Sequence, residues 1–508
     1  MKAFGKGSLF ESALRSSTAT DRVLVIIQLQ GGNDGLNTVI PLDQYSALST
    51  ARANILIPEN LVLPLTGTTV TGLHPSMPEI QGLFNNKQAM IIQGVSYPNP
   101  NFSHFEATDI WMTASDSEES LITGWAGRYL GVEDPGYPTG YPNQNNPDPL
   151  AIQIGSTVST TLQGPSASMG IALTNTTNFY QLTSGNYGQA PSTPAGHELA
   201  FIRETSIETQ AYSSAIKQAA LNQQNLSTLY PTAGTNELAD QLKIVAQLIG
   251  GGLQTKIYMV SLGSFDTHSS QVSATGGNQT GTHANLLSKF SVAINAFMDD
   301  ITKMNQQDRV LGMTFSEFGR RIISNGSQGT DHGTSEPVFL FGTQVSGGLL
   351  GTNPVIPANA TVNDNLVMQT DFRSVYSTML ANWFCVPVDT VNSIMGTPDQ
   401  SSFPLLDVLT ASCTNTTGIS QASSGANTLR NYPNPANGST IIEFQTTGGS
   451  LEIKLYDAVG NEIKTLVDGS YSPGSYQIEV DTHKLASGMY YYTLRQGTQK
   501  ITEKMLVM

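Results

Sequence analysis

Residues 326–334 read GSQGTDHGT and place two side chains that can bind a metal, Asp331 and His332, next to each other. One interpretation is a polar surface turn, because Gly, Ser and Asp are ordinary turn residues. The other is a ligand pair, because carboxylate oxygen and imidazole nitrogen both bind divalent metals. Adjacent side chains on a strand point to opposite faces, so both would reach one ion only through the backbone freedom that Gly329 and Gly333 can supply.

Further candidate ligands follow apolar runs elsewhere in the chain. Five such runs read as strands buried on both faces, and they cover residues 23–29 or begin at Ala89, Lys256, Arg309 and Pro337. Polar residues that could do chemistry come after four of these runs: Asn33, Asp34, Ser103, His104, Asp266, His268, Glu317 and Arg320. In open α/β sheets, ligands bind beyond the carboxyl ends of the strands, so we expect these groups to gather at one edge.

The elements that must position these groups alternate between strands and helices. Residues 235–250 and 283–304 carry apolar side chains at helical spacing. Alternation of this kind predicts an α/β fold with a mostly parallel sheet sandwiched by helices. Residues 131–195 are rich in turn formers, and we interpret them as excursions from the sheet that could form a cap over a site.

The chain divides by composition into four segments. Residues 1–20 form an N-terminal extension, and residues 21–405 form the α/β domain. Residues 406–430 are a polar tract rich in Ser, Thr and Gly, as expected of a linker. Residues 431–508 contain short alternating strands with turn signals between them, which predicts a small all-β sandwich, and no catalytic cluster is visible in it.

The composition argues against two classes of partner. The formal net charge is -15, and such an acidic surface disfavours both nucleic acid and anionic membranes. No apolar run approaches the roughly 20 residues that a transmembrane segment needs. The first residues lack the apolar core of a signal peptide, so the protein is cytosolic or its chain begins after a removed leader. The two cysteines, Cys385 and Cys413, either form one disulfide or are buried thiols.

Several motifs in combination resemble one protein family. LQGGNDGLNTVIP, FSHFEATDIW, SFDTHSSQ, SEFGRRIISNGSQGTDHGT and DFRSVY closely resemble the DUF1501 family over residues 20–410. This bacterial family of unassigned function is placed with the alkaline phosphatase and sulfatase superfamily. The segment from NYPNPANGST to KITEKMLVM resembles a type A sorting domain of the type IX secretion system of Bacteroidetes-like bacteria. The second resemblance implies the secretion machinery as a partner, and export from the periplasm to the outer-membrane surface or beyond, with a leader that is absent from this chain.

The superfamily resemblance implies a first metal site. There, one metal is held by an Asp after the first strand, by the nucleophile and by a late Asp-His pair. Asp34, Ser103, Asp331 and His332 match these positions in order and context. Two structural alternatives stay open, because Asp34 could shape a turn after Gly-Gly and Ser103 could cap its own helix.

A second metal site is implied less completely. It normally takes an Asp and a His from one strand end, which Asp266 and His268 could supply. A later His usually completes it, yet the only His after His332 is His483, in the tail segment. The candidates to replace that ligand are Glu317, His104 and Asp371. Without a replacement, the protein binds one metal or is inactive.

Some of the same residues have a structural interpretation. Arg320 and Arg373 either anchor an anionic substrate or pair with buried acids, and the second is more common. His104 is more readily a core residue, or a residue that supports a ligand from behind, than a ligand itself. Three other histidines have no context that supports a site: His74, His197 and His283.

The favoured hypothesis is a secreted or cell-surface metal-dependent hydrolase of phosphate or sulfate esters. Bound divalent ions would activate the Ser103 hydroxyl and neutralise charge on an anionic ester substrate. Imidazole with carboxylate suits zinc or manganese, whereas carboxylates alone suit magnesium or calcium. The rival hypothesis is a cell-surface structural or binding protein that keeps the hydrolase fold without turnover, since a fold does not fix a function. The substrate, the metal and the oligomeric state do not follow from the sequence.

Overall fold

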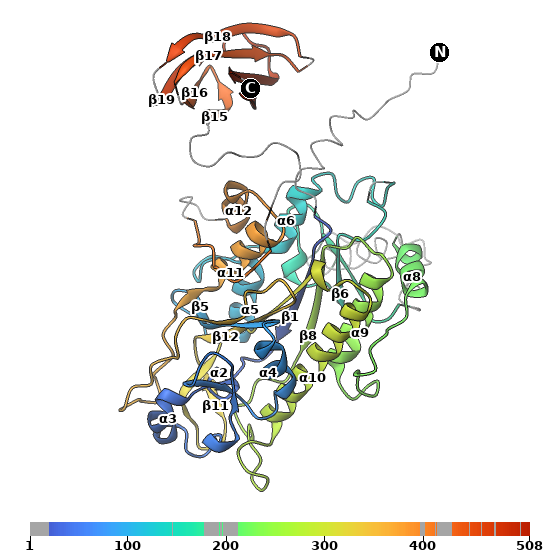
Figure 1. Ribbon diagram of the computed structural model, residues 1–508, viewed down its shortest axis with the longest axis vertical. Helices are drawn as coiled ribbons and strands as arrows, with labels where there is room; N and C mark the ends of the chain where they lie inside the picture. Colours follow the sequence, from blue (N-terminus) through green and yellow to red (C-terminus); the bar gives the residue numbers. More distant parts are fainter. Residues whose placement is uncertain are drawn as a thin grey trace. The chain divides into compact units, whose positions relative to one another are not determined.

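The chain folds into two compact units, residues 1–414 and residues 415–508. The computed structural model describes residues 20–144, 146–176, 193, 196, 212–396, 402–411, 413, 429–446, 448–458, 460–471, 474–497 and 499–507. The first unit is a mixed sheet with helices on both faces, and the second consists of strands (Figure 1). The predicted fold class, an α/β unit followed by a small all-β unit, is confirmed.

Nine strands form the central sheet of the first unit, in the order β13-β5-β12-β9-β1-β8-β6-β7 with β14 also paired to β5. Their bounds are β1 Val23–Leu29, β5 Ala89–Ser96, β6 Ala151–Ile154, β7 Gly170–Leu173, β8 Ile257–Leu262, β9 Val310–Phe315, β12 Glu336–Phe341, β13 Gly348–Leu350 and β14 Thr370–Asp371. Strand β12 runs antiparallel to β5 and β9, and the other pairs are parallel. The five apolar runs correspond to β1, β5, β8, β9 and β12, as predicted.

The centre of the sheet is β1, and its sequence explains its position. All seven of its residues, VLVIIQL, are buried, and it pairs in parallel with β8 on one side and β9 on the other. A strand covered on both faces needs a continuous apolar run, because it has no solvent side. The carboxyl ends of β1, β5, β8 and β9 therefore share one edge, where the antiparallel β12 begins.

Helices cover both faces of the sheet (Figure 1). In α4, α9 and α10 the buried residues lie on one side, and α10 packs against both of the others. A second group contains α5, α6, α11 and α12, which meet through stacked rings such as Trp125 on Tyr376. The bounds are α2 Gly35–Thr38, α3 Tyr45–Ala51, α4 Pro78–Asn85, α5 His104–Thr113, α6 Trp125–Glu133, α8 Ser213–Asn222, α9 Glu237–Gly250, α10 Thr282–Lys303, α11 Phe372–Thr378, the π-helix η5 Met379–Trp383 and α12 Val388–Met395. None of the helices in the described parts of the chain combines the length and apolar character needed to cross a membrane.

Two small ribbons stand at the edge where the strands end. One contains β2 Val39–Pro41, β3 Leu63–Pro64 and β4 Thr71–Leu73, and the other is the hairpin of β10 Arg320–Ser324 and β11 Thr330–His332. The hairpin pairs Arg320 with His332. It therefore carries the residues predicted from GSQGTDHGT next to the residues that follow β9.

The prediction of a cap over residues 131–195 is wrong in part. Strands β6 and β7 lie within this stretch and extend the main sheet beside β8. They are only four residues long each, and the surrounding turn formers hide so short an apolar signal. Residues 177–192 of the stretch lie outside the described residues.

Residues 402–411 pack on the first unit, although a linker was predicted to begin at residue 406. Val408 is completely buried, and its carbonyl oxygen accepts a hydrogen bond from the Ser346 N–H at 2.9 Å. The Thr410 N–H donates to the Gln344 carbonyl oxygen at 2.8 Å. A few apolar side chains in a polar tract thus suffice to bind it to the core.

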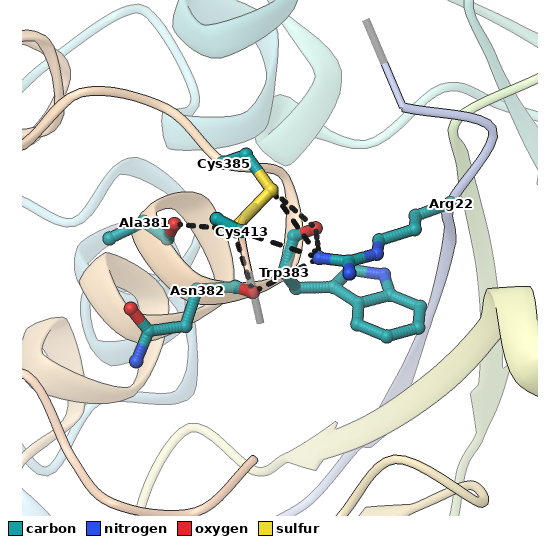
Figure 2. Close-up of a disulfide and its surroundings, with 6 residues drawn as sticks. All are labelled: Arg22, Ala381, Asn382, Trp383, Cys385 and Cys413. Atoms are coloured by element: carbon teal, nitrogen blue, oxygen red, sulfur yellow. Dashed lines mark hydrogen bonds between the residues drawn. A yellow bond between two sulfur atoms is a disulfide. The ribbon is translucent and has the colours of Figure 1, made fainter. Parts of the chain in front are cut away.

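A disulfide joins Cys385 to Cys413 and resolves the alternative that the sequence left open. Figure 2 shows this bond beside the Arg22 guanidinium, whose Nη1 donates to the Trp383 carbonyl oxygen at 2.8 Å. The guanidinium also lies over the Trp383 ring, 4.9 Å from its centroid. The disulfide therefore fastens the end of the first unit beside the residue that precedes β1.

The second unit has its own apolar core. Its strands are β15 Leu429–Asn437, β16 Ser439–Thr446, β17 Gly449–Tyr456, β18 Glu462–Tyr471, β19 Gly474–Asp481, β20 Gly488–Gln496 and β21 Gln499–Val507. Their order is β18-β17-β20-β21-β15-β16-β19, and only the β15–β21 pair is parallel. Alternate residues of β17 are buried, which is the period expected of a strand with one face on a core.

Removal of the disulfide should destabilise the first unit. The bond closes a loop between residues 28 positions apart, so the Cys413→Ser variant should lose roughly 3–4 kcal/mol of unfolding free energy. The three tryptophans, Trp111, Trp125 and Trp383, all belong to the first unit, so their fluorescence during urea unfolding reports on that unit alone. The double variant with Cys385→Ser is the control and should match the single variant. An unchanged urea midpoint in both variants would contradict this role.

Candidate functional site

Two imidazoles and a carboxylate meet at the edge where the strands end. One ligand atom from each of His104, Asp266 and His332 lies within 4.8 Å of the other two. His104 is the first residue of α5, Asp266 follows β8, and His332 ends β11. The convergence of groups from separate strand ends was predicted, and the structure brings these three together.

The proton on His104 is fixed by a buried acid. Its Nδ1 lies 2.7 Å from Oε1 of Glu317, whose side chain is buried. A carboxylate accepts hydrogen bonds, so Nδ1 carries a proton and donates it to Glu317. The other ring nitrogen, Nε2, lies 3.5 Å from Oδ2 of Asp266.

The proton on His332 is fixed in the same way by the backbone. Its Nδ1 lies 2.6 Å from the Phe102 carbonyl oxygen, which can only accept, so Nδ1 is again the donor. The other nitrogen, Nε2, is buried, has no hydrogen-bond partner and lies 3.7 Å from Oδ1 of Asp266. Burial lowers the pKa of His332, the hydrogen bond to Phe102 acts against this, and the charges of Arg320 and the neighbouring imidazoles lower the pKa further.

Asp266 is held as an anion between these imidazoles. Its Oδ1 lies 2.6 Å from His268 Nδ1 and accepts a hydrogen bond from Arg320 Nη2 at 2.8 Å. Partial burial opposes the charge, but the hydrogen bond and charge of Arg320, with the nearby imidazoles, lower the pKa of Asp266 to about 2. Nε2 of His104, Nε2 of His332 and the Asp266 carboxylate therefore face one another. Imidazole nitrogen and carboxylate oxygen at this spacing are atoms that could bind one divalent cation.

Aromatic rings pack the ligands into one arrangement. The Phe318 ring centroid lies 4.9 Å from that of His104 and 4.4 Å from that of His332. The His332 ring is also 4.5 Å from the rings of His104 and His268. His268 thus contacts both Asp266 and His332, although it is not one of the three groups whose ligand atoms converge.

The Gly-Gly pair after β1 allows this close packing. Gly31 has a φ of +122°, and a Cβ there would collide with the backbone of Phe265 and Asp266. Its N–H donates to Oε1 and Oε2 of Glu317 at 2.9 and 3.1 Å. A residue other than glycine would push the end of β1 away from the acid that holds His104.

Arg320 supports the site and has no donors directed at a substrate. Its side chain is fully buried, and its donors reach the carbonyl oxygens of Gly31, Gly32, Phe265 and Thr330 as well as Asp266. Of the two interpretations that the sequence allowed, pairing with an acid is the one the structure has.

The structure does not bring Asp34 to this cluster. Its carboxylate is buried and accepts from Arg52 Nη1 at 2.9 Å on both oxygens, and from Gln271 Nε2 at 2.6 Å. Arg52 is itself fully buried and donates to the Ile322 carbonyl oxygen at 3.0 Å. Burial opposes the charge on Asp34, yet Arg52, His283 and Gln271 outweigh it and lower the pKa. The carboxylate is thus committed to neutralising an internal guanidinium.

Asn33 lies in the same buried region as His74 and His283, two of the histidines whose sequence context supports no site. Its Oδ1 accepts from Thr38 Oγ1 at 2.9 Å and lies 3.1 Å from His283 Nε2. Burial lowers the pKa of His74 to about 3 and that of His283 to about 4, so both rings are neutral. His197, the third such histidine, lies outside the described residues.

Asp331 also lies apart from the cluster, and the explanation offered for the glycines needs correction. Residues Thr330–His332 form the strand β11, so Asp331 points away from His332, and its exposed carboxylate accepts from Asn325 Nδ2 at 3.0 Å. Neither Gly329 nor Gly333 has a positive φ. A Cβ at either would collide with a neighbouring backbone, so these glycines permit close approach and do not turn two ligands toward one ion.

Of the remaining candidates, Ser103 is next to His104 in the sequence, and Asp371 and Arg373 form a separate ion pair. Ser103 is exposed, precedes α5, makes no side-chain capping bond and stands between Phe102 and His104. Asp371 caps α11, and its oxygens accept from Arg373 Nε at 3.0 Å and Nη2 at 2.8 Å. Arg373 also pairs with Asp116, so this ion pair supports α11.

Three participants have weak or no signals in the sequence. Phe318 stands between Glu317 and Arg320 in SEFGR, and an aromatic side chain there reads as ordinary core. The Phe102 carbonyl oxygen is a backbone group and carries no sequence signal. Arg52 is the residue that follows the short helix α3. Its only signal in the sequence is a charged residue between two alanines, in ARA, which is consistent with a buried ion pair.

A search of curated proteins gave no match to this chain. Among solved structures, the chain is similar to a protein of the alkaline phosphatase superfamily from Vibrio parahaemolyticus, with 10% identity, coverage of 93% of this chain and 82% of that chain, and a TM-score of 0.34. It is similar to the PsFucS1 sulfatase from Pseudoalteromonas sp., with 8% identity, coverage of 93% and 86%, and a TM-score of 0.31. It is also similar to latent PorU from Porphyromonas gingivalis, with 15% identity, coverage of 18% of this chain and 10% of that chain, and a TM-score of 0.15. Similarities this low carry no activity over to this chain.

Two family models match the sequence. One, described as a secretion system C-terminal sorting domain, matches residues 430–508 and marks the chain for export. The other, described as a protein of unknown function (DUF1501), matches residues 139–393, just over half of the chain. With the α/β unit and its strand-end cluster, this match means that the chain belongs to the DUF1501 family.

Proposed function

We propose that this chain is a secreted or cell-surface hydrolase of phosphate or sulfate esters that uses one divalent ion held by His104, Asp266 and His332. The observation that carries the proposal is the convergence of three ligand atoms from separate strand ends, with Nδ1 of each histidine bound on its far side by Glu317 or the Phe102 carbonyl oxygen. Nε2 of His332 is buried without a hydrogen-bond partner and faces Asp266, and a bound cation would satisfy it.

The donor set favours some metals over others. Two imidazole nitrogens and a carboxylate oxygen suit zinc or manganese, and magnesium and calcium prefer oxygen alone. We propose one ion and not two, because Asp34, the expected ligand of another ion, is already neutralised by Arg52. The ion would polarise an ester oxygen and neutralise the charge that develops there.

His268 and Ser103 are assigned the proton and nucleophile roles. Nδ1 of His268 lies 2.6 Å from Oδ1 of Asp266, and the ring is partly exposed. A histidine beside a carboxylate can act as a general base. Ser103 offers an exposed hydroxyl beside His104, at the start of α5, as the nucleophile.

Glu317 is assigned the role of holding His104. Its carboxylate accepts from both the His104 Nδ1–H and the Gly31 N–H. A carboxylate behind a metal-binding histidine fixes the tautomer and increases the basicity of the coordinating nitrogen.

Replacement of the proposed ligands should remove the metal, whereas replacement of the neighbouring Asp331 should leave metal binding unchanged. Asp266→Asn and His332→Ala should weaken zinc affinity by more than about 100-fold, because outer partners alone account for about 10- to 100-fold. Asp331→Asn is the matched control and should keep full metal content, since its carboxylate faces Asn325. Metal analysis after dialysis, with aryl phosphate and aryl sulfate hydrolysis, measures both effects. Zinc-loaded protein that hydrolyses neither ester would favour a binding protein without turnover.

Loss of the Glu317 carboxylate should act through His104. Glu317→Gln keeps the size of the side chain, and it should weaken zinc affinity about 10- to 100-fold while the unfolding midpoint changes little. Glu106→Gln changes an exposed acid two residues from His104 and should leave zinc affinity as it is. Equal zinc affinity in both variants would mean that Glu317 has no part in metal binding.

Deletion of residues 431–508 should separate folding from export. The first unit has its own core, so the truncated chain should unfold at the same urea concentration by tryptophan fluorescence. In its native host it should accumulate in the periplasm, because the type IX machinery would no longer recognise it. Surface delivery of the truncated chain, detected by protease accessibility of whole cells, would contradict the sorting assignment.

A further inference from the structure

The two cysteines of the disulfide differ in their access to solvent. Cys413 is exposed and is the last described residue of the first unit, whereas Cys385, two residues after η5, is half-buried. A thiol from solution therefore reaches Cys413 more readily than Cys385. Access alone does not decide which sulfur is attacked, because the other sulfur must leave as a thiolate.

A guanidinium lies against the sulfur that would leave. Figure 2 shows Nη1 of Arg22 beside both sulfur atoms, 3.4 Å from Sγ of Cys385 and 3.7 Å from Sγ of Cys413. The same Nη1 donates to the carbonyl oxygens of Trp383 at 2.8 Å and Asn382 at 3.2 Å, which fix its position. Because a guanidinium is not deprotonated in proteins, the positive charge beside Cys385 is permanent.

Backbone carbonyl groups lie closer to the other sulfur. Sγ of Cys413 lies 3.4 Å from the Ala381 carbonyl oxygen and 3.3 Å from that of Asn382, at the end of η5 (Figure 2). Sγ of Cys385 is farther, 3.9 Å, from the Trp383 carbonyl oxygen. Carbonyl groups at the end of a helix carry partial negative charge, which disfavours a thiolate beside them. The electrostatics and the access to solvent thus agree on Cys413 as the attacked sulfur and Cys385 as the one that leaves.

We propose that this disulfide is a thiol-exchange site, in which an external thiolate bonds to Cys413 and Cys385 leaves as a thiolate that Arg22 stabilises. The external sulfur forms a new S–S bond with Sγ of Cys413. The bond between the two cysteines breaks, and its electron pair goes to Sγ of Cys385. A reagent with a second thiol then completes the reduction: that thiol attacks the reagent's own bonded sulfur, its proton passes to Cys413, and the reagent is oxidised to a disulfide.

The first unit should stay folded while the bond exchanges. Residues 402–411 are bound to it independently of the disulfide, by the buried side chain of Val408 and by backbone hydrogen bonds to Gln344 and Ser346. The two cysteines therefore remain near each other after the bond opens. Exchange at this site is reversible, since the thiolate of Cys385 can attack Cys413 again and expel the external thiol.

The first test identifies the attacked sulfur. The full-length chain is treated briefly with reduced glutathione, trapped with excess N-ethylmaleimide, digested and analysed by mass spectrometry. Glutathione on Cys413 with N-ethylmaleimide on Cys385 should exceed the reverse arrangement by about tenfold or more. Equal amounts of the two arrangements, glutathione mainly on Cys385, or no adduct in the folded chain would overturn the proposal.

The second test removes the positive charge. Arg22→Gln should lower the rate constant of exchange with glutathione about tenfold, and Arg22→Lys should restore most of it, because the leaving thiolate loses and regains its counter-charge. A purely structural role of Arg22 predicts the opposite sign, since a loosened chain end exposes both sulfurs and speeds the attack. Lys303→Gln is the control, because it removes an exposed positive charge from α10, and it should leave the rate unchanged. A rate that rises or stays the same in Arg22→Gln would overturn the role of Arg22.

A third measurement keeps Arg22 in place and needs no charge variant. Cys413→Ser and Cys385→Ser each leave one thiol, and the rate of its alkylation by iodoacetamide is followed against pH. The half-maximal rate for Cys385 should lie at a pH at least about 1 below that for Cys413, because a thiolate beside a guanidinium forms at lower pH. An equal or higher midpoint for Cys385 would overturn the proposal.

The source of the thiol is distinguished by comparing two reagents at equal thiol concentration. Reduction by thioredoxin more than about tenfold faster than by dithiothreitol would identify a protein dithiol as the partner. Slower reduction by thioredoxin would identify small thiols. Resistance of the folded chain to both reagents would overturn the exchange site itself.

Discussion

The buried guanidinium of Arg320 is the constraint on which the rest of the site depends. A fully buried charge is tolerated only where it is paired and its donors are satisfied. Arg320 meets this condition with main-chain carbonyls and one carboxylate from three segments: Gly31, Gly32, Phe265, Thr330 and Asp266. The ends of β1 and β8 and the strand β11 are thereby tied to one side chain. Displacement of any of them would leave a buried charge unpaired, so the segments that carry the ligands are held as one body.

The different burial of Asp34 and Asp266 decides which of the two carboxylates can bind a cation from solution. Asp34 is 1% exposed, and its oxygens are taken by Arg52 and Gln271. Asp266 is 47% exposed, and its Oδ2 faces His104 while Arg320 binds its Oδ1. For Asp34 the internal guanidinium occupies the place of a counter-ion, and removal of either partner would leave a buried charge. For Asp266 the arginine occupies only Oδ1, and the side that faces the imidazoles is where we propose that the metal binds.

The main sheet and about half of the cluster could be predicted from the sequence. Continuous apolar runs locate strands buried on both faces, and the rule that ligands bind beyond strand ends brought Asp266, His268 and His332 together. The pairing of Asp34 with Arg52 could not be predicted from the sequence. A buried ion pair depends on how distant segments pack, and it produces no periodic pattern of residues. The strand β11 was equally hidden. A three-residue strand in a Gly-rich stretch has no alternation to read, yet it is what sends Asp331 away from His332.

The two proposed imidazole ligands are arranged before any ion arrives. Glu317 and the Phe102 carbonyl oxygen bind Nδ1 of His104 and His332, so the Nε2 atoms of both rings are directed at Asp266 by folding itself. Preorganisation of this kind reduces the ordering cost of binding, because the rings need not be reoriented when the ion binds. The bond to Phe102 also ties His332 to the segment that precedes α5, which begins at His104. The positions of the two proposed imidazole ligands are therefore coupled through one backbone carbonyl, and a change that moves residues 101–104 would disturb both together.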